Sequence, residues 1–136
     1  MHDETTLIGF ATTALAFHGD TELTCDQPLS RVELDALHEH AVALHMLLDR
    51  GTVRTRAHEA AEGDQLHNAR IRTWQASEHL HAAYHAAPRA DGRTPTREAC
   101  ALRLPEGATD LTICQRHVKA SRRVRLFTTP TDLIRR

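Results

Sequence analysis

The chain has 136 residues with a formal net charge of −1, and 40% of them are hydrophobic and 26% charged. This composition fits one globular domain over residues 1–136 and excludes a disordered or fibrous chain. No apolar run approaches the ~20 residues that a membrane-spanning helix needs, and the acidic N-terminal sequence lacks the positive charge of a secretory signal. We therefore expect a cytoplasmic protein that does not act at a membrane.

The first two predicted helices cover residues 5–18 and 31–50. In the first, apolar residues recur at helical spacing until a glycine ends the pattern. The second begins with a capping box, in which the Ser30 hydroxyl accepts from the N–H of Glu33 and the Glu33 carboxylate reaches back to the N–H of Ser30. Gly51 is predicted to end this helix. One narrow stripe of it is predicted to face the core: Leu34, Leu37, Ala41, Leu44 and Leu48.

The third helix is predicted over 55–87 and the fourth over 109–127, with a long irregular connection over 88–108 and a tail over 128–136. The third helix has two stripes, and one of them carries Trp74 among histidines. A helix with two such stripes is expected to be contacted by two neighbours. The sequence therefore predicts an all-α fold, a four-helix-bundle-like single domain with a long irregular connection between its third and fourth helices.

The third predicted helix carries a candidate metal site. Glu78, His81 and His85 lie three and four residues apart, so they share one helix face, and such residues can ligate zinc or iron. If the second and third helices are antiparallel about residue 53, the nearest groups from other helices are His18, Cys114 and His117, of which His18 and His117 are possible further ligands. The favoured alternative is that these histidines are surface groups or hydrogen-bond to acidic side chains.

The sequence also allows a second set of zinc ligands and two pairs of neighbouring histidines. Cys114 and His117 lie on the helix that the same register brings near the third helix, and together with Cys100 they could form a zinc site. Three widely spaced cysteines do not indicate a disulfide scaffold, and a small buried cysteine is the commoner outcome. The register also predicts two histidine pairs, His38/His67 and His45/His58.

The eleven histidines make pH a physical variable, because an imidazole titrates near pH ~6.5. If the histidines beside Trp74 are buried and neutral, we expect the free energy of unfolding to fall below about pH 6.

Charge is distributed unevenly along the chain. Residues 1–49 carry nine acidic residues against one arginine, and residues 111–136 carry seven basic residues against one aspartate. We favour internal pairing of these two regions, but the basic end could also attract an anionic partner such as nucleic acid. The predicted patch for such a partner consists of Arg116, Lys119, Arg122, Arg123 and Arg125.

The sequence contains no nucleophile elbow, phosphate-binding loop or dinucleotide-binding motif, so an enzyme is less expected than a non-catalytic protein. Resemblance to small uncharacterised proteins of high-GC bacteria is carried by three blocks, LDALHEHAVALHMLLDRGT (34–52), RIRTWQASEHLHAAYHAAP (70–88) and LTICQRHVKASRRVR (111–125). It implies a shared helical fold and no activity. We therefore predict a binding or regulatory module that acts through a protein partner or self-association. A metal-binding bundle and a nucleic-acid-associated protein are the alternatives.

Overall fold

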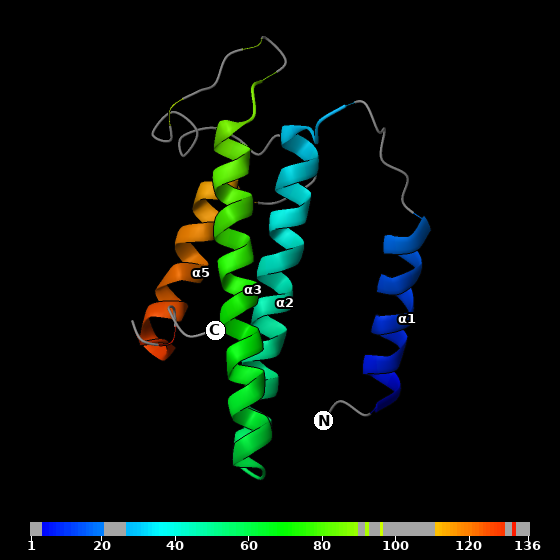
Figure 1. Ribbon diagram of the computed structural model, residues 1–136, viewed down its shortest axis with the longest axis vertical. Helices are drawn as coiled ribbons and strands as arrows, with labels where there is room; N and C mark the ends of the chain where they lie inside the picture. Colours follow the sequence, from blue (N-terminus) through cyan, green and yellow to red (C-terminus); the bar gives the residue numbers. More distant parts are fainter. Residues whose placement is uncertain are drawn as a thin grey trace.

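The computed structural model describes residues 4–20, 27–89, 92, 96, 111–129 and 132. These residues contain no strand and form four helices, α1 (Glu4–Asp20), α2 (Arg31–Arg56), α3 (Ala60–Ala86) and α5 (Ile113–Phe127) (Figure 1). The predicted all-α fold with four helices is confirmed. Most of the predicted connection over 88–108 lies outside the described residues, as does most of the tail. Within the described part of the chain, no helix is long and apolar enough to cross a membrane.

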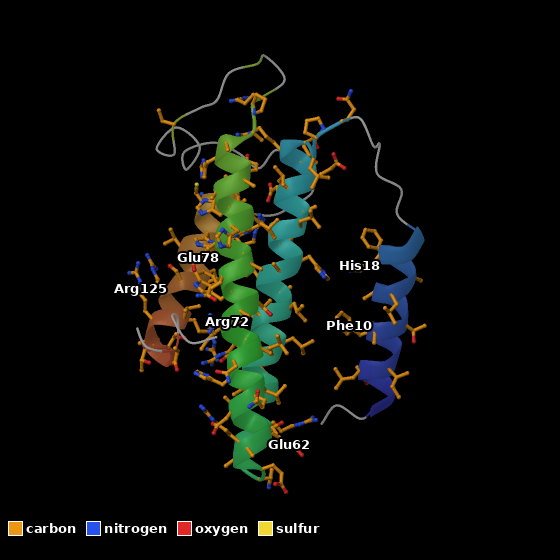
Figure 2. The ribbon with its side chains drawn as sticks, in the orientation of Figure 1. Phe10, His18, Glu62, Arg72, Glu78 and Arg125 are labelled. Carbon is orange, nitrogen blue, oxygen red and sulfur yellow. The ribbon has the colours of Figure 1, made fainter. Side chains whose placement is uncertain are left out.

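Three of the helices form the core. α2 and α3 pack side by side along their lengths as an antiparallel hairpin, and α5 lies against both of them (Figure 1). α1 lies beside α2 and outside the three-helix core, and none of its described side chains over 6–19 is buried. Phe10 and His18 project from α1 outside the three-helix core (Figure 2).

The starts of two helices follow local sequence rules. The capping box at the start of α2 is confirmed, with 3.1 Å from the Glu33 N–H to the Ser30 Oγ and 3.0 Å from the Ser30 N–H to the Glu33 Oε1. Thr112 and Gln115 form a second capping box, which starts α5 at Ile113 rather than at the predicted residue 109.

The hairpin turn differs from the prediction. α2 continues through Gly51 to Arg56, and α3 begins at Ala60, so the predicted helix end at Gly51 is wrong. Glycine costs only about 1 kcal/mol inside a helix, and the next residue, Thr52, is buried and donates to the carbonyl of Leu48 at 2.7 Å. Gly63 has a packing role instead, since a Cβ atom there would lie 2.8 Å from the Cα of Arg56.

The core combines small apolar clusters with buried polar groups. One cluster contains Leu34, Tyr84, Ile113 and Cys114, and the other contains Val42, Trp74, Ala120 and Val124. The predicted leucine stripe of α2 is confirmed in part: Leu34 and Ala41 are buried and Leu44 and Leu48 are half-buried, but Leu37 is 38% exposed. α2 also buries a polar face that the stripe did not predict, which comprises Asp35, His38, His45, Asp49 and Thr52.

Candidate metal centre

Charged side chains lie between the helices of the core. Arg116 of α5 donates to Asp35 of α2 at 2.7 Å, and Asp49 of α2 accepts from Arg70 of α3 and, at 2.6 Å, from Arg123 of α5. Burial by itself raises the pKa of Asp49, but the two arginines outweigh it and hold this pKa below its usual value. Acidic α2 and basic α5 are therefore paired internally at these positions, which is the arrangement that the charge pattern favoured.

This pairing changes the predicted basic patch. Arg116 is buried, and Arg123 bonds Asp49 through its Nε. Arg123 stays 46% exposed at its side chain, so a nucleic-acid surface would rest on four exposed side chains rather than five, one of them already paired with Asp49, which weakens this alternative. The other exposed members are Lys119, Arg122 and Arg125, the last of which is labelled in Figure 2.

A hydrogen-bonded chain runs from Arg116 through two histidines. The Nε of Arg116 can only donate, so the Nδ1 of His38, 3.3 Å away, accepts. The proton of a neutral His38 is then on Nε2, which donates at 2.9 Å to the Nδ1 of His117. Burial and the nearby Arg116 lower the pKa of His38 to about 3, so its ring is neutral. His117 is held by this bond and by stacking on Trp74, with ring centroids 4.6 Å apart.

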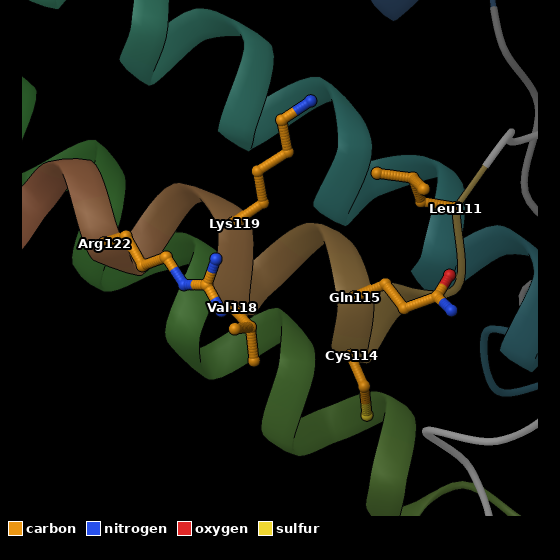
Figure 3. A pocket seen from close by; sticks show the side chains of 6 residues that line it. All are labelled: Leu111, Cys114, Gln115, Val118, Lys119 and Arg122. Atoms are coloured by element: carbon orange, nitrogen blue, oxygen red, sulfur yellow. The ribbon is translucent and has the colours of Figure 1, made fainter.

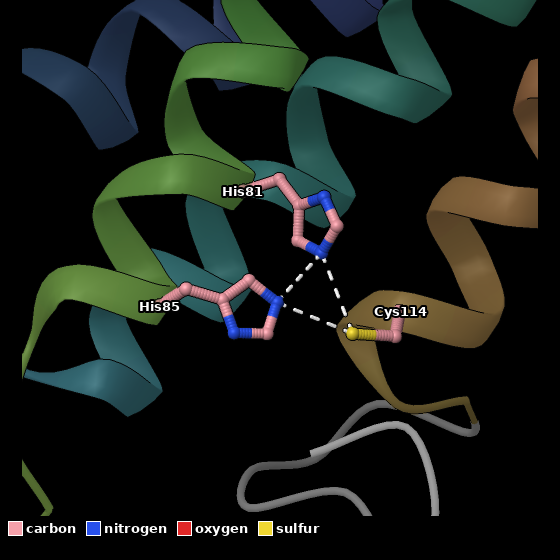
Figure 4. A group of neighbouring side chains, drawn as sticks. All are labelled: His81, His85 and Cys114. Carbon is pink, nitrogen blue, oxygen red and sulfur yellow. Dashed lines mark hydrogen bonds between the residues drawn. The ribbon is translucent and has the colours of Figure 1, made fainter. Parts of the chain in front are cut away.

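Three potential metal ligands converge beside this chain. The Nε2 atoms of His81 and His85 lie 2.9 Å apart, and the Sγ of Cys114 lies 3.4 Å from the first and 3.2 Å from the second (Figure 4). His85 and Cys114 are buried, and His81 is half-buried. We call these three residues the His–His–Cys group.

Local structure explains why the three side chains meet. His81 and His85 are four residues apart on α3, so they lie one above the other on one face of the helix. The capping box at Thr112 fixes the first turn of α5, where Cys114 is the second helical residue. The group therefore joins two helices that are separated in sequence by a long connection.

The spacing suits a tetrahedral ion. With Zn–N bonds of about 2.0–2.1 Å and a Zn–S bond of about 2.3 Å, tetrahedral angles require ligand separations of about 3.3 Å for N–N and about 3.6 Å for N–S. The separations in the His–His–Cys group are 2.9, 3.2 and 3.4 Å. Each is within about 0.5 Å of these values, so small side-chain movements would accommodate the ion.

The structure brings together some of the residues proposed from the sequence and not others. His81 and His85 converge, whereas Glu78 is exposed and is not part of the group (Figure 2). His18 is exposed on α1 and contacts the ring of His40, with centroids 5.3 Å apart. The ring of His117 lies 4.5 Å from that of His81, but its Nδ1 is bonded to His38. Cys114, which the sequence places near the third helix but pairs with Cys100 and His117 as a zinc ligand, is the third member of the group.

The two predicted histidine pairs do not form. His38 bonds His117, and the Nδ1 of His45 lies 3.0 Å from the carbonyl oxygen of Arg70. His67 contacts Arg70 and Asp132, and His58 is exposed. The reason is the register, because the hairpin turns at residues 57–59 rather than about residue 53. Every residue of α2 therefore faces a later part of α3 than predicted.

A surface groove of about 540 Å³ adjoins the His–His–Cys group (Figure 3). Cys114 contributes both to its lining and to the group, so this thiol lies at the boundary between the core and the surface. An ion could reach the group from this side. The groove is lined by Leu111, Cys114, Gln115, Val118, Lys119 and Arg122.

A model of a family of unknown function, DUF6238, matches residues 1–136, which is the whole chain. The chain belongs to this family. No curated protein and no solved structure matches this DUF6238 chain. The predicted resemblance to an uncharacterised family is thus confirmed, and an origin in high-GC bacteria stays a prediction.

Proposed function

We propose that this DUF6238 protein binds a zinc-class transition-metal ion through His81, His85 and Cys114. The observation that carries the proposal is the convergence of two imidazole nitrogens and one thiol sulfur, from two helices, at separations of 2.9–3.4 Å. Thiolate and imidazole are ligands that zinc prefers, and they match its tetrahedral spacing. Cys114 has to stay reduced, as it does in the cytoplasm that the sequence predicts.

The ligand set favours zinc over iron. Di-iron helical bundles use carboxylates from several helices, and the His–His–Cys group contains none, since Glu78 is exposed. A zinc ion with three protein ligands has a fourth position for water or another ligand. Cys100, which lies outside the described residues, is the other cysteine that the sequence suggests as a zinc ligand.

Elemental analysis tests the proposal. Protein made without a histidine tag is incubated with Zn²⁺ under reducing conditions and dialysed, and we expect about one equivalent of zinc per chain. His81→Ala and Cys114→Ala should each reduce this content at least tenfold, because two ligands bind zinc far more weakly than three. His79→Ala is the matched control, since His79 is exposed on the same helix and should leave the zinc content unchanged.

Spectroscopy of the cobalt-loaded protein identifies the ligands. Co²⁺ should give a thiolate-to-metal charge-transfer band that Cys114→Ala weakens at least twofold and that His79→Ala preserves. Cys100→Ala decides whether a second thiolate takes the fourth position, since it would then weaken the band. Less than a tenth of an equivalent of zinc after loading, or equal losses in His79→Ala and His81→Ala, would contradict the proposal.

A second observation supports the predicted partner-binding role. α1 exposes large apolar side chains over most of its length, more than a monomeric protein usually leaves in water. They are Leu7, Ile8, Phe10, Leu15 and Phe17, which are 44–74% exposed.

We propose that α1 is the contact element in self-association or partner binding. Sedimentation velocity tests the first possibility: the chain should associate as its concentration rises, and Leu15→Glu should abolish the association. A chain that stays monomeric at every concentration rules out self-association.

A further inference from the structure

We infer that a metal ion bound by the His–His–Cys group fastens α5 to the α2–α3 hairpin, so that metal occupancy controls whether α5 is docked. The inference rests on the proposed metal binding. His81 and His85 belong to α3 and Cys114 to α5, so an ion that engages all three ligands can bind only when the helices are together.

The contacts of α5 with the hairpin are limited in extent. α5 has 15 residues against 26 and 27 in α2 and α3, and it packs on them over a much shorter stretch than they pack on each other. Over residues 113–126, whose side chains the structure describes, the buried apolar side chains of α5 are few and mostly small, namely Ile113, Cys114, Ala120 and Val124.

The ion pairs of α5 define its position on the hairpin more than they add to the free energy of docking. Arg116 and Arg123 form ion pairs with Asp35 and Asp49 of α2. The desolvation of Arg116 and of the two carboxylates, whose side chains are at most 10% exposed, offsets much of this attraction. A cross-link at one end of α5 therefore changes the docking equilibrium substantially.

Linkage sets the size of the effect. Undocking of α5 separates Cys114 from the two histidines and leaves only a two-ligand site on α3. An ion that binds the docked form alone raises the ratio of docked to undocked molecules by the factor 1 + [ion]/Kd, which is about 100-fold when the free ion is at 100 times its Kd. Docking and zinc affinity are therefore coupled in both directions.

The chain contains its own reporter of docking. Trp74 is the only tryptophan and is 4% exposed. Its indole stacks on His117 of α5, with ring centroids 4.6 Å apart and planes 16° from parallel, and it packs against Ala120 and Val124 of the same helix. Undocking would expose Trp74 to water and shift its fluorescence emission to longer wavelength.

Hydrogen exchange of the full chain with Zn²⁺ and with excess chelator tests the inference. Chelation should speed exchange of the α5 amides at least tenfold and red-shift the Trp74 emission, while the central amides of α2 and α3 change little. Zn²⁺ should reverse both changes. Cys114→Ala should show rapid α5 exchange with or without Zn²⁺, whereas His79→Ala should respond like the natural chain. Slow exchange in α2 and α3 shows that each variant is folded.

The outcomes separate this inference from the proposed function. If one equivalent of zinc binds but α5 exchange is the same with and without it, the docking inference is wrong and metal binding stands. If chelation speeds exchange equally in α2, α3 and α5, the ion stabilises the whole fold and the inference is again wrong. If no zinc binds, both fall together.

Discussion

Substitution of Asp35 tests the buried ion pairs on which the position of α5 depends. Asp35 and Arg116 are 2% and 10% exposed at their side chains, and Asp35→Ala leaves the guanidinium without its carboxylate. Breaking a buried ion pair from one side costs about 3–5 kcal/mol. For a domain of this size each kcal/mol lowers Tm by about 4 °C, so we expect a decrease of about 12–20 °C.

The assay is thermal unfolding followed by circular dichroism at 222 nm, with two comparisons. Asp64→Ala breaks the exposed ion pair with Arg56, whose side chains are 63% and 46% exposed, and should cost less than about 1 kcal/mol. The double variant Asp35→Leu with Arg116→Met removes both charges and should recover most of the loss. An Asp35→Ala variant as stable as Asp64→Ala, or a double variant less stable than Asp35→Ala, would refute the reasoning.

Three further predictions concern pH, packing and metal ligation. His38 and His45 are buried with lowered pKa values, that of His38 to about 3. Acid therefore protonates the unfolded chain first, and the free energy of unfolding should fall by about 1 kcal/mol per histidine between pH 7.5 and pH 5.5; equal Tm values at the two pH values would contradict this. In urea denaturation, Gly63→Ala should destabilise by about 1–3 kcal/mol, because its Cβ would meet the end of α2. Gly51→Ala, whose Cβ has no atom within 4 Å, should raise the free energy of unfolding by up to about 1 kcal/mol. Equal changes in this free energy for the two variants would contradict the packing argument. His117→Ala should keep its zinc content in elemental analysis, since His117 bonds His38; a loss of zinc while the α5 amides still exchange slowly would make His117 a ligand.

Local sequence patterns predict which segments are helical, but they do not predict how α2 and α3 are aligned with each other. The capping box at Ser30 involves contacts within four residues, so the sequence can reveal it. The end of α2 depends on tertiary packing, because burial of Thr52 outweighs the modest cost of Gly51 inside a helix. The resulting shift of the hairpin turn accounts for both failed histidine pairs.

The polar part of the buried face of α2 escapes sequence prediction for a related reason. Leucine spacing favours the face with Leu37, yet the structure buries Asp35 and Asp49 on a neighbouring face. These carboxylates can be buried because Arg70, Arg116 and Arg123 hydrogen-bond them from the other two helices. The spacing of apolar residues is a property of one helix, so it carries no information about charged partners on the other helices.

The same buried contacts select the third metal ligand. His117 and Cys114 are both on the side of α5 near His81, and the sequence offers no reason to choose between them. Arg116 can only donate, so it fixes the proton of His38 on Nε2, and that proton occupies the Nδ1 lone pair of His117. The Sγ of Cys114 instead points at both imidazole nitrogens of α3 (Figure 4). The ligand set thus follows from a hydrogen-bonded chain that begins at a buried arginine, which is why spacing along one helix could supply His81 and His85 but not their partner.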